Sequence, residues 1–117
     1  MIKDFLELEA IIQNTVKFLK ALGDSTRLEI IDLLKKGEIT STEIQDSLKK
    51  SQSTISQHLK TLLDAGIIKF RTDGKKIYSI NDPDLFKILN LFQSFITKIQ
   101  NEKIEELSQL GVLDTLL

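Results

Sequence analysis

Two helix-start signals lie close together in the middle of the chain, and their spacing limits the folds that this sequence can adopt. The segment TSTE at residues 40–43 has the pattern of a capping box, in which the Thr and Glu side chains each accept a hydrogen bond from a free backbone N–H. Ser51 can cap a second helix that runs to about Ala65, where Gly66 supplies a left-handed turn. Because only two or three residues separate these helices, they must cross at a steep angle, which predicts a helix-turn-helix over residues 40–65.

The hydrophobic pattern changes its period directly after this helix pair. Residues 67–80 contain IIKFRT and KKIYSI, two β-rich runs on either side of the dipeptide Asp73-Gly74. Such a dipeptide suits a two-residue type I′ turn, so these runs predict a β-hairpin. Asp82 and Pro83 then indicate a long helix over residues 83–108, with Asp82 as its cap and Pro83 at its first helical position.

Two further helices are predicted ahead of the helix pair. Apolar residues at helical spacing mark residues 1–21, and Asp24 can cap a helix that Gly37 ends. The fold class is therefore mainly α with a small β-hairpin wing at residues 67–80, in the order α-α-α-α-β-β-α. A helix-turn-helix followed directly by a hairpin is a winged helix-turn-helix, and 117 residues suit a single domain over 1–117.

The composition argues against several kinds of site. The chain has no cysteine, which excludes disulfides and thiolate chemistry, and its one histidine leaves little for a transition-metal site. We therefore expect no metal ion and no cofactor. Acidic residues interrupt the apolar positions near the N-terminus, and no run approaches the roughly 18 apolar residues of a membrane span. We expect a cytoplasmic protein with no membrane partner.

The net charge of −1 is unevenly distributed along the chain. Between Lys49 and Lys76 the sequence holds seven Lys or Arg residues and only two acids. A basic band inside an otherwise acidic chain is typical of a surface that binds nucleic acid.

The single histidine, His58, follows Ser56 on the helix that Ser51 begins. Residues two apart on a helix do not face each other, so Ser56 and His58 cannot act as a nucleophile and its base. No other catalytic pair is present, so we predict that the chain is not an enzyme and has no catalytic residue. Thr54 and Thr61 lie one turn on either side of His58, which favours a structural histidine with local hydrogen bonds over a functional ligand.

The face of this helix that lies opposite its apolar side chains carries short hydrogen-bonding groups. Gln and Ser side chains can bond base edges in the major groove, and a Lys can contact phosphate. Basic residues around the hairpin tip could meet flanking phosphates. We therefore predict double-stranded DNA as a partner. The predicted DNA-binding set is Gln52, Ser53, Thr54, Ser56, Gln57 and Lys60 on the helix, with Arg71, Lys75 and Lys76 on the wing.

Three segments together resemble one known family. They are LGDSTRLEII (22–31), SQSTISQHLKTLLDAGII (51–68) and DGKKIYSI (73–80), and in this order they are similar to the ArsR/SmtB family of winged-helix repressors. The resemblance covers about residues 15–82. It implies a homodimer that is joined through its first and last helices and represses transcription from a palindromic operator. The family's base-contacting positions fall here on Gln52, Ser53, Ser56 and Gln57.

The chain departs from this family at the positions that bind metals. Many members use paired cysteines at the start of the third helix, where this chain has Thr40 and Thr42. Other members use Asp and His pairs on the last helix, which has no histidine here. We therefore expect no metal sensing through these positions, and an effector small molecule stays unknown.

The last predicted helix carries a broad apolar stripe with a seven-residue repeat at Leu85, Phe92 and Ile99. A single chain of this size would cover the stripe poorly, which favours burial against a second copy, while a pocket for an apolar effector is the alternative. The family resemblance implies that the first helix also takes part in the dimer interface. The predicted dimerisation set is therefore Phe5, Leu8, Ile12, Leu85, Ile88, Phe92, Phe95 and Ile99.

Two other functions stay open from the sequence. A winged-helix protein-interaction module would favour apolar or acidic side chains on the exposed helix face. An architectural DNA-binding protein would favour a strongly positive net charge. The observed face and the net charge of −1 disfavour both, so a sequence-specific DNA-binding regulator is the preferred prediction.

Overall fold

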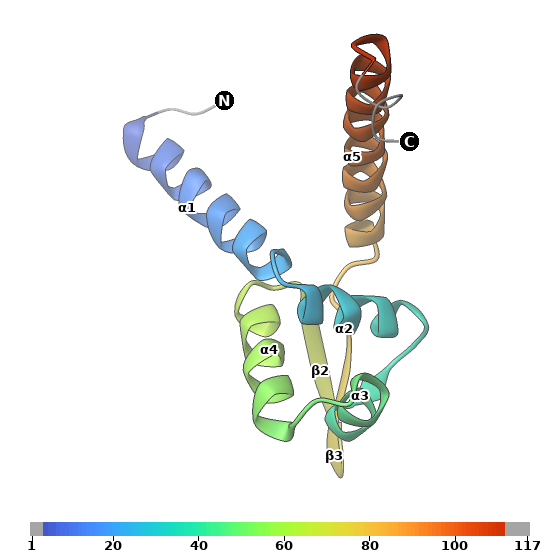
Figure 1. Cartoon of the computed structure of the whole chain (residues 1–117). Helices are drawn as coiled ribbons and strands as arrows, with labels where there is room; N and C mark the ends of the chain where they lie inside the picture. The colour runs from blue at the N-terminus through green and yellow to red at the C-terminus, as the bar shows by residue number, and fades with distance from the viewer. Residues whose placement is uncertain (1–3, 112–117) are drawn as a thin grey trace. The chain divides into compact units, whose positions relative to one another are not determined.

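The computed structural model describes residues 4–111 (Figure 1). Its elements are α1 (Phe5–Leu22), α2 (Ser25–Lys35), β1 (Ile39–Thr40), α3 (Ser41–Leu48), α4 (Gln52–Asp64), β2 (Ile68–Asp73), β3 (Lys75–Ile80) and α5 (Asp84–Gln109). This mainly helical fold with a small antiparallel sheet confirms the predicted winged helix-turn-helix. The chain forms two compact units, one ending at Asp82 and one beginning at Pro83, and the single domain over 1–117 stays a prediction.

Local capping signals begin α2, α3 and α4, as the sequence predicts. The Asp24 carboxylate accepts a hydrogen bond from a backbone N–H in the first turn of α2. Thr40 and Glu43 form the capping box, with N···O distances of 3.2 and 3.4 Å for its two reciprocal bonds. The Ser51 hydroxyl accepts the Thr54 N–H at 3.2 Å and begins α4. Each cap satisfies an N–H that has no partner inside its own helix.

The core lies where α2, α3 and α4 meet one another and the sheet. Its largest fully buried side chains are Ile30, Ile31, Ile44, Ile55 and Leu62. Full burial of a side chain of this size is worth about 1.5–3 kcal/mol, so these five residues strongly favour the observed helix packing. Because Ile55 and Leu62 point inward from α4, the opposite face of that helix is turned to solvent.

The sheet has three strands in the order β1–β3–β2, one more than the predicted hairpin. The element order is therefore α-α-β-α-α-β-β-α, which corrects the predicted α-α-α-α-β-β-α. Strand β1 is formed only by Ile39 and Thr40, which pair with Tyr78 and Ile77 of β3. A two-residue strand has no alternating pattern of its own, and it exists here because β3 supplies its backbone partner.

The hairpin turn differs from the predicted type I′ turn. Asp73 pairs in register with Lys75, so Gly74 alone lies at the tip. A type I′ turn needs a positive φ at both central residues, whereas Gly74 has a φ of 72° and Asp73 has none in that region. A left-handed backbone costs a residue with a Cβ roughly 1–2 kcal/mol, so the observed register leaves this conformation to the glycine.

The terminal helices differ from their predicted ranges by small shifts. Helix α1 begins at Phe5, and residues 1–3 of the predicted range 1–21 lie outside the described residues. Helix α5 begins at Asp84, with Pro83 and not the predicted Asp82 at the N-cap position and with no side-chain capping hydrogen bond, although the φ of −63° and ψ of −11° of Pro83 are already helical. Boundary assignments commonly differ by one or two residues, so the long final helix predicted over 83–108 is confirmed.

Candidate nucleic-acid interface

Helix α4 presents most of the predicted DNA-contacting residues to solvent. Five of the six predicted α4 residues are exposed: Gln52, Ser53, Ser56, Gln57 and Lys60. Ser53, Gln57 and Lys60 lie opposite the buried residues Ile55, Leu59 and Leu62, Ser56 lies at the edge of that face, and Gln52 is exposed at the first position of the helix. Four of the five are uncharged side chains that can both donate and accept hydrogen bonds. Such a surface suits base edges in a major groove better than it suits an ion.

Thr54 is the predicted α4 residue that is not fully exposed. Its side chain accepts a hydrogen bond from the Ser51 hydroxyl at 2.9 Å, and its backbone N–H donates to the same oxygen at 3.2 Å. The Ser51 oxygen also lies 3.3 Å from the Ser53 hydroxyl. Thr54 therefore helps to hold the start of α4, and its contact with DNA stays a prediction.

A tight connection positions α4 against α3. Lys49 ends α3 with a left-handed backbone, at φ 55° and ψ 46°, and its N–H donates to the Gln45 carbonyl. This conformation is uncommon for a residue other than glycine, and it turns the chain sharply so that Ser51 can begin α4 two residues later.

Arg71 of the wing is paired within the chain. Its Nε donates to Glu38 Oε2 at 2.9 Å, and its Nη1 lies 3.9 Å from Asp73 Oδ2. The Arg71 and Glu38 side chains keep 57% and 47% of their surface exposed. A phosphate group could therefore approach Arg71, but it would compete with the Glu38 carboxylate.

The other two basic wing residues lie near the hairpin tip. The Lys76 Nζ is 4.6 Å from the centroid of the Phe70 ring, a cation–π geometry that holds the ammonium group over the sheet. The Phe70 ring in turn lies 6.0 Å from the Tyr78 ring, and burial raises the pKa of Tyr78. Lys75 is exposed next to Gly74.

His58 contacts other side chains within the chain, but its partners are not the neighbouring threonines. Its Nδ1 lies 3.1 Å from Arg27 Nη1, and its Nε2 lies 3.9 Å from Asp24 Oδ1. Thr61 donates instead to the Gln57 carbonyl on its own helix. The predicted local hydrogen bonds of His58 are therefore wrong, because the partner of its Nδ1 is the Arg27 guanidinium of α2.

Asp24 belongs to the same cluster and has an altered acidity. The Arg27 backbone N–H, which donates to Asp24 Oδ1 at 3.1 Å, holds the pKa of this carboxyl below its ordinary value. Partial burial acts in the opposite direction, while the charges of His58 and Arg27 lower the pKa further.

The start of α3 carries no thiolate and is occupied by the capping box. The Thr40 hydroxyl donates to Glu43 Oε1 at 3.0 Å and accepts the Glu43 N–H, while Thr42 is exposed. Across residues 4–111, no three His, Asp or Glu side chains gather closely enough to hold a metal ion. In the same range, every helix is too short or too polar to cross a lipid bilayer.

Apolar side chains on α1 and α5 are exposed in the single chain. Seven of the eight predicted dimerisation residues are exposed: Phe5, Leu8, Ile12, Ile88, Phe92, Phe95 and Ile99. Phe5 and Phe95 keep 76% and 64% of their surface in solvent. Leu85, the eighth, is already buried within the chain. Their role in dimerisation stays a prediction.

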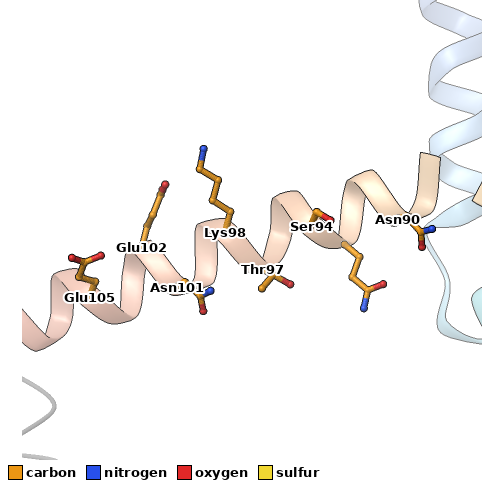
Figure 2. Close-up of a pocket in the computed structure, with 8 residues that line it drawn as sticks. Asn90, Ser94, Thr97, Lys98, Asn101, Glu102 and Glu105 are labelled. Carbon is orange, nitrogen blue, oxygen red and sulfur yellow. The ribbon is translucent and has the colours of Figure 1, made fainter. Parts of the chain in front are cut away.

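A strip of polar side chains runs along α5. Figure 2 shows its side chains in a row on one helix: Asn90, Ser94, Thr97, Lys98, Asn101, Glu102 and Glu105. All of the lining residues come from α5, so the strip is an open helix surface. It does not resemble the apolar pocket that the effector alternative needs, and that alternative stays untested.

Comparison with known proteins identifies relatives of this chain. Residues 24–69 match the family model described as "Bacterial regulatory protein, arsR family". The chain is 39% identical over 80 residues to the arsenical resistance operon repressor of Staphylococcus aureus, covering 65% of this chain and 77% of that protein. It is 40% identical over 79 residues to a probable mercury resistance operon repressor of Streptomyces lividans, covering 67% of this chain but 63% of that protein.

A solved structure has a similar fold. It is the homodimeric winged helix-turn-helix DNA-binding domain (fragment 1–100) of Mb0332 from Mycobacterium bovis, a possible ArsR-family transcriptional regulator. The two structures superpose with a TM-score of 0.75 at 25% identity, over 87% of this chain and 95% of that chain.

Proposed function

Because this chain belongs to the ArsR family of bacterial regulatory proteins, we propose that it is a homodimeric repressor that binds a palindromic operator. It is a DNA-binding transcriptional regulator and not an enzyme. The arsenical resistance relative is a repressor, and the structural relative is a homodimer, which supports both finer parts of the proposal. We place its action in the cytoplasm, where operator DNA is accessible.

We call α4 the recognition helix. The observation that supports the proposal most strongly is the exposed, uncharged face of this helix. Gln52, Ser53, Ser56 and Gln57 occupy its first two turns, and the N-terminal end of such a helix contacts bases in the helix-turn-helix mode. A Gln can bond adenine through two hydrogen bonds, and Ser can bond several bases. We assign sequence discrimination to these residues.

The wing and Lys60 supply contacts that do not depend on sequence. Lys60, Lys75 and Lys76 are exposed and basic, and Arg71 could exchange Glu38 for a phosphate. Each cation that neutralises a phosphate releases counterions, so these contacts should make binding weaker as salt is raised.

The exposed apolar residues of α1 and α5 support a dimer. Side chains such as Phe5 and Phe95 would remove a large apolar area from water against a second copy, at roughly 25 cal/mol per Å². A two-fold axis would then present two recognition helices to half-sites about 34 Å apart, which explains why a palindrome is expected.

The proposal leaves the effector open. Thr40 and Thr42 replace the cysteines used by metal-sensing members, and Thr40 is committed to the capping box. Any small-molecule effector would act by favouring a dimer geometry whose recognition helices no longer match the operator spacing.

Selection of bound fragments from a random DNA pool, at low and near-physiological salt, tests the function. A palindrome recovered at the higher salt supports the dimeric repressor. Binding that is lost as salt rises, with no preferred sequence, would instead indicate an architectural DNA-binding protein. Absence of DNA binding at both salt concentrations would favour a protein-interaction module.

Two variants separate base contacts from phosphate contacts. Gln57→Ala should cost about 1–3 kcal/mol on the preferred operator and relax preference at one base step. Lys75→Gln should weaken binding to every duplex and reduce the salt slope by about one. If both variants change affinity and preference in the same way, the division between the recognition helix and the wing is wrong.

A further inference from the structure

We propose that Arg27 is a positioning residue, which ties the recognition helix to the end of α1 through His58, and that protonation of His58 releases this tie. The part of the inference that concerns DNA affinity rests on the proposed function. The tie itself is a feature of the free protein and can be tested without DNA.

The Arg27 guanidinium joins three helices. From α2, its Nε donates to the Ala21 carbonyl at 2.6 Å, and its Nη2 donates to the Lys20 carbonyl at 3.0 Å. Both carbonyls lie in the last turn of α1, where backbone oxygens carry partial negative charge, and the Lys20 carbonyl also accepts the Gly23 N–H at 3.2 Å. The remaining nitrogen, Nη1, lies 3.1 Å from His58 Nδ1 on α4. Arg27 therefore fixes the recognition helix relative to the end of α1.

The contact determines which nitrogen of His58 carries the proton. An arginine has five N–H donors and no acceptor, and it stays charged at all relevant pH values. His58 Nδ1 must therefore act as an acceptor, and the proton of the neutral ring lies on Nε2. Asp24 Oδ1 lies 3.9 Å from this Nε2, beyond hydrogen-bond distance.

A second proton on His58 would be incompatible with the tie. It would place an N–H on Nδ1 directly against the Arg27 N–H and set two cations beside each other. Two carbonyls of α1 still hold Arg27, so the imidazole and the part of α4 that carries it would have to move. Histidine commonly gains this proton between pH 5 and 8.

Charged groups of both signs lie around His58. The Asp24 carboxylate at the start of α2 lies 3.9 Å from His58 Nε2, and the Arg27 guanidinium lies 3.1 Å from His58 Nδ1. Lys17 and Lys20 of α1 line a shallow cleft with Arg27, Thr61 and Asp64. Within this cluster the cations Arg27, Lys17 and Lys20 outnumber the carboxylates Asp24 and Asp64.

The direction in which operator affinity changes as the pH falls distinguishes release of the tie from simple electrostatic attraction. An added positive charge on a DNA-binding protein should strengthen its attraction to phosphates. Release of the recognition helix should instead weaken operator binding as the pH falls. The same link connects α4 to α1, whose exposed residues Phe5, Leu8 and Ile12 we assign to the dimer, so movement at the dimer helix could reach the DNA-contacting surface.

Nuclear magnetic resonance of the free protein tests the tie. His58 is the only histidine in the sequence, so its ring ¹⁵N signals need no assignment by mutation. We expect the Nε2–H tautomer at pH 8, and a shift of the Nδ1 resonance in Arg27→Gln, with no such shift in Lys17→Gln. An Nδ1–H tautomer, or equal spectra in the wild type and Arg27→Gln, would overturn the inference whatever DNA the protein binds.

Operator affinity at pH 8 and pH 5.5 tests the consequence. The wild type should lose about tenfold in affinity at the lower pH, the size of one hydrogen bond to a charged group. His58→Asn keeps an acceptor near Nδ1 but does not titrate, so it should bind like the wild type at pH 8 and keep that affinity at pH 5.5.

Two controls accompany this measurement. Lys17→Gln should keep the wild-type pH dependence, since it removes a charge from the same cleft and leaves the tie intact. Thermal unfolding at both pH values checks that each variant is folded. An equal pH dependence in the wild type and His58→Asn would refute the release mechanism while leaving the repressor proposal unaffected.

Discussion

Changing Glu38 to Gln should increase the affinity of this protein for DNA of any sequence. In the free protein the Glu38 carboxylate holds Arg71 through a 2.9 Å hydrogen bond, and both side chains are about half exposed. If Arg71 contacts a phosphate, it must leave this partner first. The Glu38 charge would also lie near the phosphate and repel it.

The magnitude follows from the exposure of the pair. An exposed ion pair is worth about 0.2–1 kcal/mol, so its loss on binding reduces affinity by up to roughly fivefold. Repulsion between Glu38 and a phosphate adds to this, but it is screened over about 10 Å at 0.1 M salt. We therefore expect Glu38→Gln to bind about two- to tenfold more tightly at 0.1 M salt, with a smaller gain at higher salt.

Fluorescence anisotropy with a selected operator and with a scrambled duplex measures the effect. Both duplexes should gain alike, because the proposal assigns Arg71 to phosphate and not to a base. Glu9→Gln on α1 makes the same change of charge away from the wing and controls for net charge. The free energy of unfolding should change by less than about 1 kcal/mol, because the pair is exposed.

A double-mutant cycle with Arg71→Gln gives the decisive comparison. If Glu38 acts by competing for Arg71, most of its effect should disappear when Arg71 is absent. An unchanged affinity in Glu38→Gln, or a gain that is the same with and without Arg71, would refute competition between Glu38 and phosphate for this guanidinium.

Three further predictions concern stability and assembly. Thr40→Ala should lower the free energy of unfolding by about 1 kcal/mol in a denaturant titration, whereas Thr40→Ser should keep most of it, because the hydroxyl caps α3. The lowered pKa of Asp24 means that its carboxylate contributes stability above the unfolded value, and this contribution is lost as the pH falls below about 4. Asp24→Asn should thus lose less stability between pH 5 and 2 in thermal unfolding, and an equal loss would contradict the assignment. Phe95→Asp should convert a dimer to a monomer in analytical ultracentrifugation, and an unchanged mass would remove Phe95 from the interface.

Features with a local cause could be predicted from the sequence. Asp24, Thr40 and Ser51 each cap the helix that directly follows, so a few neighbouring residues determine where α2, α3 and α4 begin. The inward face of α4 also follows from its own apolar spacing. The predicted type I′ turn failed because the dipeptide Asp73-Gly74 allows more than one register, and pairing along β2 and β3 selects between them.

Features that depend on distant segments could not be predicted in the same way. Ile39 and Thr40 form a strand only because β3 lies beside them. His58 meets Arg27, which is 31 residues away in the chain, and spacing along α4 pointed to threonines instead. Arg71 was predicted as a phosphate contact, and its pairing with Glu38, 33 residues earlier, becomes visible only in three dimensions.

The placement of charge suggests how this protein could discriminate between DNA sequences. Its net charge is −1, so attraction to any DNA must come from the local basic residues of the wing and α4. Within the wing, Arg71 is held by Glu38 and Lys76 lies over Phe70. If these residues contact phosphates, the intramolecular partners should reduce the sequence-independent part of binding. Tight binding would then need the hydrogen bonds of the uncharged α4 face, and those form only with matching bases. A repressor built this way would bind DNA other than its operator weakly. Strengthening the phosphate contacts through Glu38→Gln should raise the affinity for operator and scrambled duplexes by the same factor, so more DNA outside the operator would be bound at a given protein concentration.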